Sequence, residues 1–190
     1  MPTRNVNLTD ELDRFVAKKV KTGRYENASE VVRAGLRTLE REEQQYEAKI
    51  AALKAAIDAG DASRIAKGNV FGRARKASIF LCRRANLGSF RFSRRAEADL
   101  LSIGDYTLRT WSKTQAARYL GELEVCCQTL SDNPALGRLC DEVRPGLRRL
   151  EHGKHVVFYR QERGGILVSR ILHQGMLPEL HSTEDQDHEP

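Results

Sequence analysis

Two different hydrophobic patterns follow one another along this chain. Over residues 3–9 apolar and polar positions alternate, with Val6 and Leu8 on one face, which is the period of a strand. From about Asp10 onward the apolar positions recur every three or four residues, as in amphipathic helices. In the second half the order is reversed, because a pair of helices precedes three strand-like runs. The pattern therefore predicts two small domains that meet within residues 60–90.

Two helices are predicted after the first strand. Thr9 is a typical N-cap for a helix from Asp10 to about Thr22, which Gly23 ends. Asn27 and Glu30 have the spacing of a capping box and open the second helix. The apolar stripes of the two helices are Leu12, Phe15, Val16 and Val20, and then Val31, Val32, Leu36 and Leu39.

The predicted strand over residues 3–9 has no partner within its own half of the chain. A single short strand can neither bury its apolar face nor satisfy its backbone groups. Antiparallel pairing with the same strand of a second copy would solve both problems and predicts a homodimer or a higher homo-oligomer. The resulting two-stranded ribbon fits the major groove of DNA. Asn is disfavoured in strands, so Asn5 and Asn7 on one face favour base contacts over a merely solvated surface.

The sequence TRNVNLTDEL…GRYENASEVVRAGLRTLE closely resembles ParD-type antitoxins of the ribbon-helix-helix family. The resemblance covers residues 2 to about 60. It implies that Thr3, Asn5 and Asn7 face the bases of operator DNA and that Arg4 lies near the phosphates. It also implies that the start of the second helix, with Asn27 and Ser29, anchors the DNA backbone through its amides.

A further helical stripe continues beyond this core. Tyr46, Ile50, Leu53 and Ile57 lie on one face of a helix over residues 46–59, and the run 59–63 is expected to break it. In the resembled family this region grips the toxin. The alternative is a third helix that closes the core of the dimer itself.

Residues 67–84 are basic but contain large apolar side chains, among them Val70 and Phe71. Linkers are usually poor in such residues, so we expect an extended clamp that folds onto a groove, followed by a linker over residues 83–89. A solvated tether is the alternative. The residues predicted to neutralise the toxin are therefore Tyr46, Ile50, Leu53, Ile57, Val70 and Phe71.

The second half predicts a small α+β domain. A brief strand at 90–92 leads to a helix capped by Ser93 and ending near Thr110, and a second helix follows over about 113–133. Three strands are expected at 147–150, 155–160 and 166–172, joined as a meander by His152-Gly153 and Gly164-Gly165. The run SRRAEADLLSIGDYTLRTWS…NPALGR…RPGLRRLEHGKHVVFYR…ILVSRILHQGM resembles ParE-type toxins of the RelE/ParE superfamily over residues 90–181.

This resemblance implies a toxin that blocks DNA gyrase by binding it, whereas RelE-like relatives cut mRNA on the ribosome. Cleavage of RNA needs a cation at the scissile phosphate and groups that move protons. The candidates for that chemistry are Arg148, His155, Tyr159, Arg170 and His173. ParE-type toxins usually share these sequence motifs but have no nuclease activity. We therefore interpret His155 and Tyr159 as hydrogen-bonded core positions and expect no catalytic residue.

Composition adds a basic character to both halves. Residues 1–80 hold 16 Lys and Arg against 11 Asp and Glu, which favours nucleic acid or an acidic partner. The four cysteines show no CxxC spacing, so no metal and no cofactor are expected. No run reaches transmembrane length and the N-terminus lacks a signal peptide, which predicts a cytoplasmic protein without membrane contact.

Together these observations predict a fused type II toxin-antitoxin protein that is mainly α with an α+β part. The N-terminal fold is β-α-α plus an extra helix, and the C-terminal one is β-α-α-β-β-β. The expected parts are residues 1–45 for DNA binding and dimerisation, 46–82 for neutralisation, 83–89 as the linker, 90–181 as the toxin and 182–190 as a disordered acidic tail. Two alternatives stay open: a RelE-like ribosome-dependent endoribonuclease, or a repressor whose toxin-like half is inactive. Contact between the halves could form within one chain or between chains.

Overall fold

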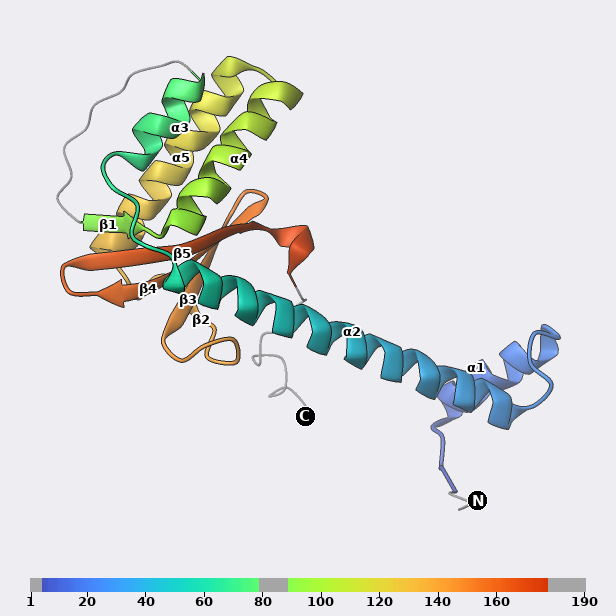
Figure 1. Ribbon diagram of the computed structural model, residues 1–190. Helices are drawn as coiled ribbons and strands as arrows, with labels where there is room; N and C mark the ends of the chain where they lie inside the picture. The colour runs from blue at the N-terminus through green and yellow to red at the C-terminus, as the bar shows by residue number, and fades with distance from the viewer. Residues whose placement is uncertain (1–4, 79–88, 178–190) are drawn as a thin grey trace. The chain divides into compact units, whose positions relative to one another are not determined.

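The computed structural model describes residues 5–78 and 89–177, and it divides the chain into two compact units, Met1–Ala48 and Lys49–Pro190. Figure 1 labels the helices and strands of both units. The long helix α2 begins in the first unit and ends in the second. The linker predicted over residues 83–89 is wrong at its last residue, because Ser89 begins the strand Ser89–Phe92. Residues 83–88 and the acidic tail lie outside the described residues.

The first unit contains α1 (Asp10–Lys21) and the start of α2 (Ala28–Ala62). Thr9 caps α1 as predicted, with its side chain accepting from the Leu12 amide, and Gly23 follows with φ +73°. The capping box is shifted by one residue. The Glu30 amide donates to Asn27 Oδ1 at 3.0 Å, but the Glu30 carboxylate accepts from the Glu26 amide at 2.7 Å.

Residues 5–9 form no strand within the single chain. Val6 and Leu8 are 65% and 36% exposed, so their apolar face has no cover from their own unit. A strand needs a hydrogen-bonded neighbour, and the predicted neighbour is the same segment of a second copy. The strand therefore stays a prediction, and Thr3 and Arg4 lie outside the described residues.

The pair of helices in the first unit encloses little core. Val16 and Val31 are buried, whereas Leu12, Phe15, Leu36 and Leu39 are all at least half exposed. Phe15, Val31 and Leu39 line an open groove of about 380 Å³ between the helices. A large apolar face of this kind indicates a surface that another protein surface covers.

The second unit is built on a five-stranded sheet. Its strands are β1 (Ser89–Phe92), β2 (Arg138–Leu139), β3 (Leu147–His152), β4 (His155–Glu162) and β5 (Gly165–His173). The order across the sheet is β1-β5-β4-β3-β2, with β1 parallel to β5 and the other neighbours antiparallel. The predicted meander is present, with Gly153 and Gly164 at positive φ in its turns, and a short 3-10 turn (Gln174–Met176) follows β5. Among the described strands, only β2 was not predicted from the sequence. It has two residues, which is too short to show the alternation of apolar and polar positions that marks a strand.

Three helices cover one face of this sheet: α3 (Val70–Ser78), α4 (Arg94–Thr110) and α5 (Lys113–Asp132), as Figure 1 shows. Ser93 caps α4 as predicted; its hydroxyl accepts from the Ala96 amide and donates to the Ser169 carbonyl oxygen. Along β4, Val157 and Tyr159 face these helices, whereas Val156 and Phe158 face the opposite side. The sheet therefore has two apolar faces, and other parts of the protein must bury both of them from solvent.

Candidate functional site

The end of α2 covers the second face of the sheet. Leu53 is 3% exposed and Ile57 is fully buried, and both pack in a cluster with Phe158, Val156 and other sheet residues. Leu53 and Ile57 are one helical turn apart, so they reach the sheet from the same stripe. Burial of two such side chains contributes about 1.5–3 kcal/mol each.

The backbone of α2 comes very close to β5 at Gly60. A Cβ atom at Gly60 would collide with the carbonyl oxygen of Ser169, so only glycine fits this approach. One turn earlier, the guanidinium of Arg170 donates to the carbonyl oxygen of Ala56 at 3.2 Å. The expected helix break at 59–63 is wrong for most of its length, because α2 continues to Ala62 while it packs on β5.

Asp61 forms a polar cluster at this contact. Its side chain is 7% exposed; one carboxylate oxygen accepts from the Ser169 hydroxyl at 2.5 Å, and the other pairs with Arg144. Arg160 approaches the same oxygen at 3.8 Å. Asp58, which is 71% exposed, lies 3.5 Å from Arg144. The helix is therefore fixed to the sheet by charge as well as by apolar contact.

The residues after α2 add a backbone pairing to the sheet. Ile65 forms an isolated antiparallel bridge with Ser93. The Ala66 amide donates to the Phe92 carbonyl oxygen at 2.8 Å, and the Arg94 amide donates to the Arg64 carbonyl oxygen at 2.9 Å. This short segment leads the chain from one face of the sheet to the other.

Residues 70–78 form helix α3, so the predicted extended clamp is wrong for this segment. Asn69 starts the helix, because its side chain accepts from the Gly72 amide at 2.6 Å. Val70, Phe71 and Ala74 are buried on one face of α3, which is helical spacing. The signal was present in the sequence as an Asn cap followed by this stripe.

α3 packs on α4, α5 and β1. The ring of Phe71 meets those of Phe90 and Phe92 edge to face, at centroid distances of 6.0 and 5.5 Å. On either side, Arg73 pairs with Glu97 of α4, and Arg75 pairs with Glu124 of α5. Two of the basic residues of this segment, Arg73 and Arg75, thus have acidic partners on α4 and α5.

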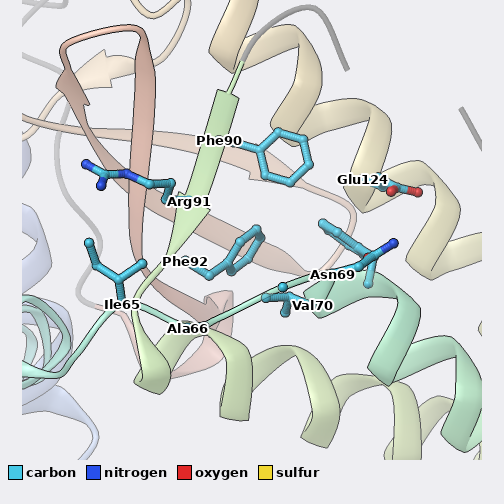
Figure 2. Close-up of a pocket in the computed structure, with 10 residues that line it drawn as sticks. Ile65, Ala66, Asn69, Val70, Phe90, Arg91, Phe92 and Glu124 are labelled. Atoms are coloured by element: carbon cyan, nitrogen blue, oxygen red, sulfur yellow. The ribbon is translucent and has the colours of Figure 1, made fainter. Parts of the chain in front are cut away.

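A cavity of about 410 Å³ lies between the chain entering α3 and strand β1. Figure 2 shows Phe90 and Phe92 projecting to one side of β1, toward Asn69 and Val70, and Arg91 projecting to the other side. Arg91 pairs with Glu162. The floor of the cavity is therefore the aromatic cluster that anchors α3.

The six residues predicted to neutralise the toxin do not share one environment. Leu53 and Ile57 lie on one face of the sheet and Val70 and Phe71 on the other, all four buried. Tyr46 and Ile50 are only half-buried. Sequence reasoning missed Gly60 and Asp61, whose contacts depend on how close the helix approaches β5.

The predicted DNA-contacting residues that the structure describes are solvent-exposed. Asn5, Asn7, Asn27 and Ser29 are all exposed, with Ser29 in the first turn of α2. The positions are accessible to DNA, and their role stays a prediction.

Two of the nuclease candidates, Arg148 and Tyr159, lie opposite each other on β3 and β4. Tyr159 is fully buried; its hydroxyl donates to the Pro134 carbonyl oxygen and accepts from the Gly137 amide, both at 2.9 Å. Burial raises the pKa of this hydroxyl. Arg148 donates to the carbonyl oxygens of Gly137 and Ala135 at 2.7 and 3.2 Å. Both side chains hold the loop before β2.

His155 and His173 form the second pair, with ring centroids 5.4 Å apart. His155 Nδ1 lies 2.7 Å from the hydroxyl of Tyr119. Burial, followed by the neighbouring His173 and His152, lowers the pKa of His155 to about 4. At neutral pH the imidazole is therefore uncharged. Four residues of strand separate His155 from Tyr159, a distance of about 13 Å.

Arg170 is the fifth candidate and has a carboxylate partner. Its guanidinium donates to both oxygens of Asp99 on α4, at 2.7 and 3.0 Å, and the Ile171 amide donates to the same carboxylate. Arg148, Tyr159 and Arg170 thus each make hydrogen bonds that hold neighbouring parts of the fold together, and His155 is in contact with Tyr119 and His173. Among residues 5–78 and 89–177, no cluster of His, Cys, Asp and Glu has the geometry to hold a metal ion.

The described cysteines, Cys126, Cys127 and Cys140, are free and buried. Burial raises the pKa of all three thiols, which keeps them protonated and unreactive at neutral pH. In the part of the chain that the structure covers, no helix has both the length and the apolar character needed to cross a membrane.

Comparison with known proteins assigns both halves. Residues 3–78 match the family described as "Bacterial antitoxin of ParD toxin-antitoxin type II system and RHH". Residues 90–178 match the "ParE toxin of type II toxin-antitoxin system, parDE". These matches confirm the resemblances and the fold class that the sequence predicts, and they define a type II toxin-antitoxin protein.

Individual relatives agree with this division. Toxin ParE1 of Mycobacterium tuberculosis (strain ATCC 25618 / H37Rv) is 46% identical over 82 residues, which are 43% of this chain and 84% of the relative. Toxin ParE1 of Caulobacter vibrioides is 40% identical over 94 residues, or 48% of this chain and 95% of the relative. Antitoxin ParD of Escherichia coli O157:H7 is 39% identical over 59 residues, or 31% and 74%. The chain belongs to the ParD antitoxin family through its N-terminal half and to the ParE toxin family through its C-terminal half.

Proposed function

We propose that the ParD part of this chain binds operator DNA, represses its own transcription and neutralises the ParE part. The ParE part, when uncovered, inhibits DNA gyrase in the cytoplasm by binding it. The parts we assign are residues 1–45 for dimerisation and DNA binding, 46–82 for neutralisation and 90–181 for the toxin. Residues 83–88 join them, since Ser89 already belongs to β1.

The observation that carries the proposal is the cover that ParD-family residues give to the ParE sheet. Leu53 and Ile57 are buried against one face, and Val70 and Phe71 are buried in the cluster on the other. All four lie within the span that matches the antitoxin family. Contacts of this extent on both faces support neutralisation in one polypeptide. Because both parts belong to one polypeptide, each would be present to the other at an effective concentration of roughly millimolar.

The DNA-binding role is supported by the exposed apolar face of the first unit. Leu12, Phe15, Leu36 and Leu39 need a cover, and a second copy of the same helices would supply it. The same dimer would place two copies of residues 3–9 side by side as the ribbon that enters the major groove.

Action by binding, without catalysis, is supported by the hydrogen bonds and ion pairs that the candidate nuclease residues make within the fold. Tyr159 and Arg148 hold the loop before β2, and Arg170 is paired with Asp99. An endoribonuclease would need such groups to converge on a phosphate. We therefore assign no catalytic residue.

The test is the double variant Leu53→Ala, Ile57→Ala in the full chain. Each truncation of a buried Leu or Ile costs about 2–5 kcal/mol, so the end of α2 should leave the sheet and growth of the host should stop. The control is Lys54→Ala, an exposed position on the same turn, which should leave growth normal. Inhibited supercoiling with intact mRNA supports a gyrase inhibitor, whereas mRNA cuts would indicate the endoribonuclease. A folded, accumulating double variant without effect on growth would contradict neutralisation by α2 and favour an inactive toxin-like half.

A further inference from the structure

Asp61 occupies a site on the ParE sheet that is built for an anion. The Ser169 hydroxyl donates to one carboxylate oxygen at 2.5 Å, and Arg144 and Arg160 approach the other. The carboxylate comes from α2, within the ParD match, whereas the three groups around it come from the ParE match. The site therefore joins an antitoxin anion to toxin cations.

Removal of α2 would leave these toxin groups without their anion. Arg144 would lose both of its carboxylate partners, because Asp58 also lies on α2. Among residues 5–78 and 89–177, Arg160 would keep Glu162, at 3.3 Å, and no described residue accepts from its buried Nε even with α2 in place. Two neighbouring guanidinium groups and a hydroxyl can make charge-assisted hydrogen bonds to a new carboxylate, so the uncovered toxin would offer a site for an anion.

We propose that Arg144, Arg160 and Ser169 form a carboxylate-binding site through which the ParE part holds an acidic segment of its protein target, and that Asp61 neutralises the toxin by occupying this site in the target's place. The proposal rests on the proposed function, since it assumes that the ParE part acts by binding a protein. It adds which chemical groups make the contact between the toxin and its target: a carboxylate on the target, and two guanidinium groups and a hydroxyl on the toxin. The neighbouring Arg170 is excluded from the site because Asp99 holds it with two hydrogen bonds.

A carboxylate is favoured over a phosphate by the present occupant. Asp61 places one oxygen on a neutral hydroxyl and the other on the guanidinium groups, which matches the two oxygens of a carboxylate. The occupant also stands on a helix that approaches β5 closely at Gly60. An acidic side chain on a protein segment reproduces this arrangement directly.

The first test is chemical rescue of the full chain carrying Asp61→Ala. Acetate has the shape of the deleted carboxylate group, so 50 mM acetate should raise the melting temperature of Asp61→Ala by several degrees relative to chloride at the same ionic strength. The wild type and Glu151→Ala, which removes an exposed carboxylate on β3 of the same unit, should show no such rise. Absence of an acetate effect in Asp61→Ala would overturn the site, and a larger effect of inorganic phosphate than of acetate would overturn its assignment to carboxylates.

The second test asks whether the target uses the same site. In the toxic Leu53→Ala, Ile57→Ala chain, Arg144→Gln should relieve growth inhibition at least tenfold in surviving colonies, whereas Arg144→Lys, which keeps the charge, should retain it. The matched control is Arg163→Gln, an exposed arginine in the β4–β5 turn, which should stay toxic. Equal toxicity of the Arg144→Gln chain would show that the arginine only holds α2 and would overturn the proposal. If the parent double variant is harmless, the proposed function fails, and the acetate experiment still decides the site.

Discussion

At the scale of single residues, local hydrogen bonds from Thr9 and Ser93 cap two helices, and long-range polar contacts from Asp61 join α2 to the sheet. Thr9 and Ser93 cap their helices as the sequence predicts, because a cap is set by the few residues that follow it. Asp61 gave no such signal, since its partners Ser169 and Arg144 lie far away in the sequence. A carboxylate in a polar stretch becomes recognisable as a site residue only when the fold brings its partners together.

Asn5 and Asn7 should determine which DNA sequence is bound. Replacement of either by Ala should reduce the preference for the operator over unrelated DNA by about 1–3 kcal/mol per lost base contact. Arg4→Ala should instead weaken binding to all sequences and reduce the salt dependence by about one counterion. Titrations of both DNA types at several salt concentrations separate these effects. Equal loss on operator and unrelated DNA for Asn5→Ala would contradict base reading.

His155 should make the second unit less stable in acid. Its pKa in the folded chain is about 4, below the ordinary value of about 6.5 for an unfolded histidine. Because the unfolded chain binds the proton more readily, the free energy of unfolding should fall as the pH drops from about 6.5 toward 4. In His155→Asn, whose amide can still meet the Tyr119 hydroxyl, this part of the decline should disappear. Denaturant unfolding at each pH gives the two curves, and parallel curves would exclude His155 as the cause.

At the scale of elements, periodic segments were predicted well and short or tertiary-dependent ones poorly. α4, α5 and the three meander strands follow from clear stripes and turn glycines. β2 has two residues and no pattern, and α3 was hidden because its basic residues resemble a tether. Arg73 and Arg75 are tolerated on α3 because Glu97 of α4 and Glu124 of α5 pair with them.

Gly60 should be essential for the contact between α2 and β5. In Gly60→Ala the new Cβ would meet the Ser169 carbonyl oxygen, and the resulting overpacking should destabilise the second unit by about 1–3 kcal/mol. Gly35→Ala is the matched control in the same helix, because nothing lies near its Cβ. That control should stabilise the helix by about 0.5–1 kcal/mol, as alanine usually does. Chemical denaturation of both variants compares the free energies of unfolding, and equal stability would contradict the close approach.

At the scale of the whole molecule, the chain has two sets of apolar surfaces that must be buried, those of the ParE sheet and that of the first unit. The ParE sheet is covered by residues 53–74 of the same polypeptide, as the buried Leu53, Ile57, Phe71 and Ala74 show. The apolar face of the first unit remains exposed within one chain. Under the proposed function, neutralisation would therefore be satisfied within one chain, whereas DNA binding would need a second copy. This division was predictable in outline from the helical stripes, but the sequence alone left neutralisation within one chain or between chains open.

Disruption of the dimer should therefore separate repression from neutralisation. The double variant Val6→Asp, Leu8→Asp places charges on the face that two ribbon strands would share, and both positions are exposed in the single chain, so folding should be preserved. Light scattering after size exclusion should show a monomer, and operator binding in gel-shift assays should fall at least a hundredfold. Growth should stay normal, because the contacts of Leu53, Ile57 and Asp61 with the sheet do not involve residues 3–9. A monomeric variant that stops growth would instead mean that each antitoxin part covers the toxin part of the other chain, and the dimer itself would then be the neutralised state.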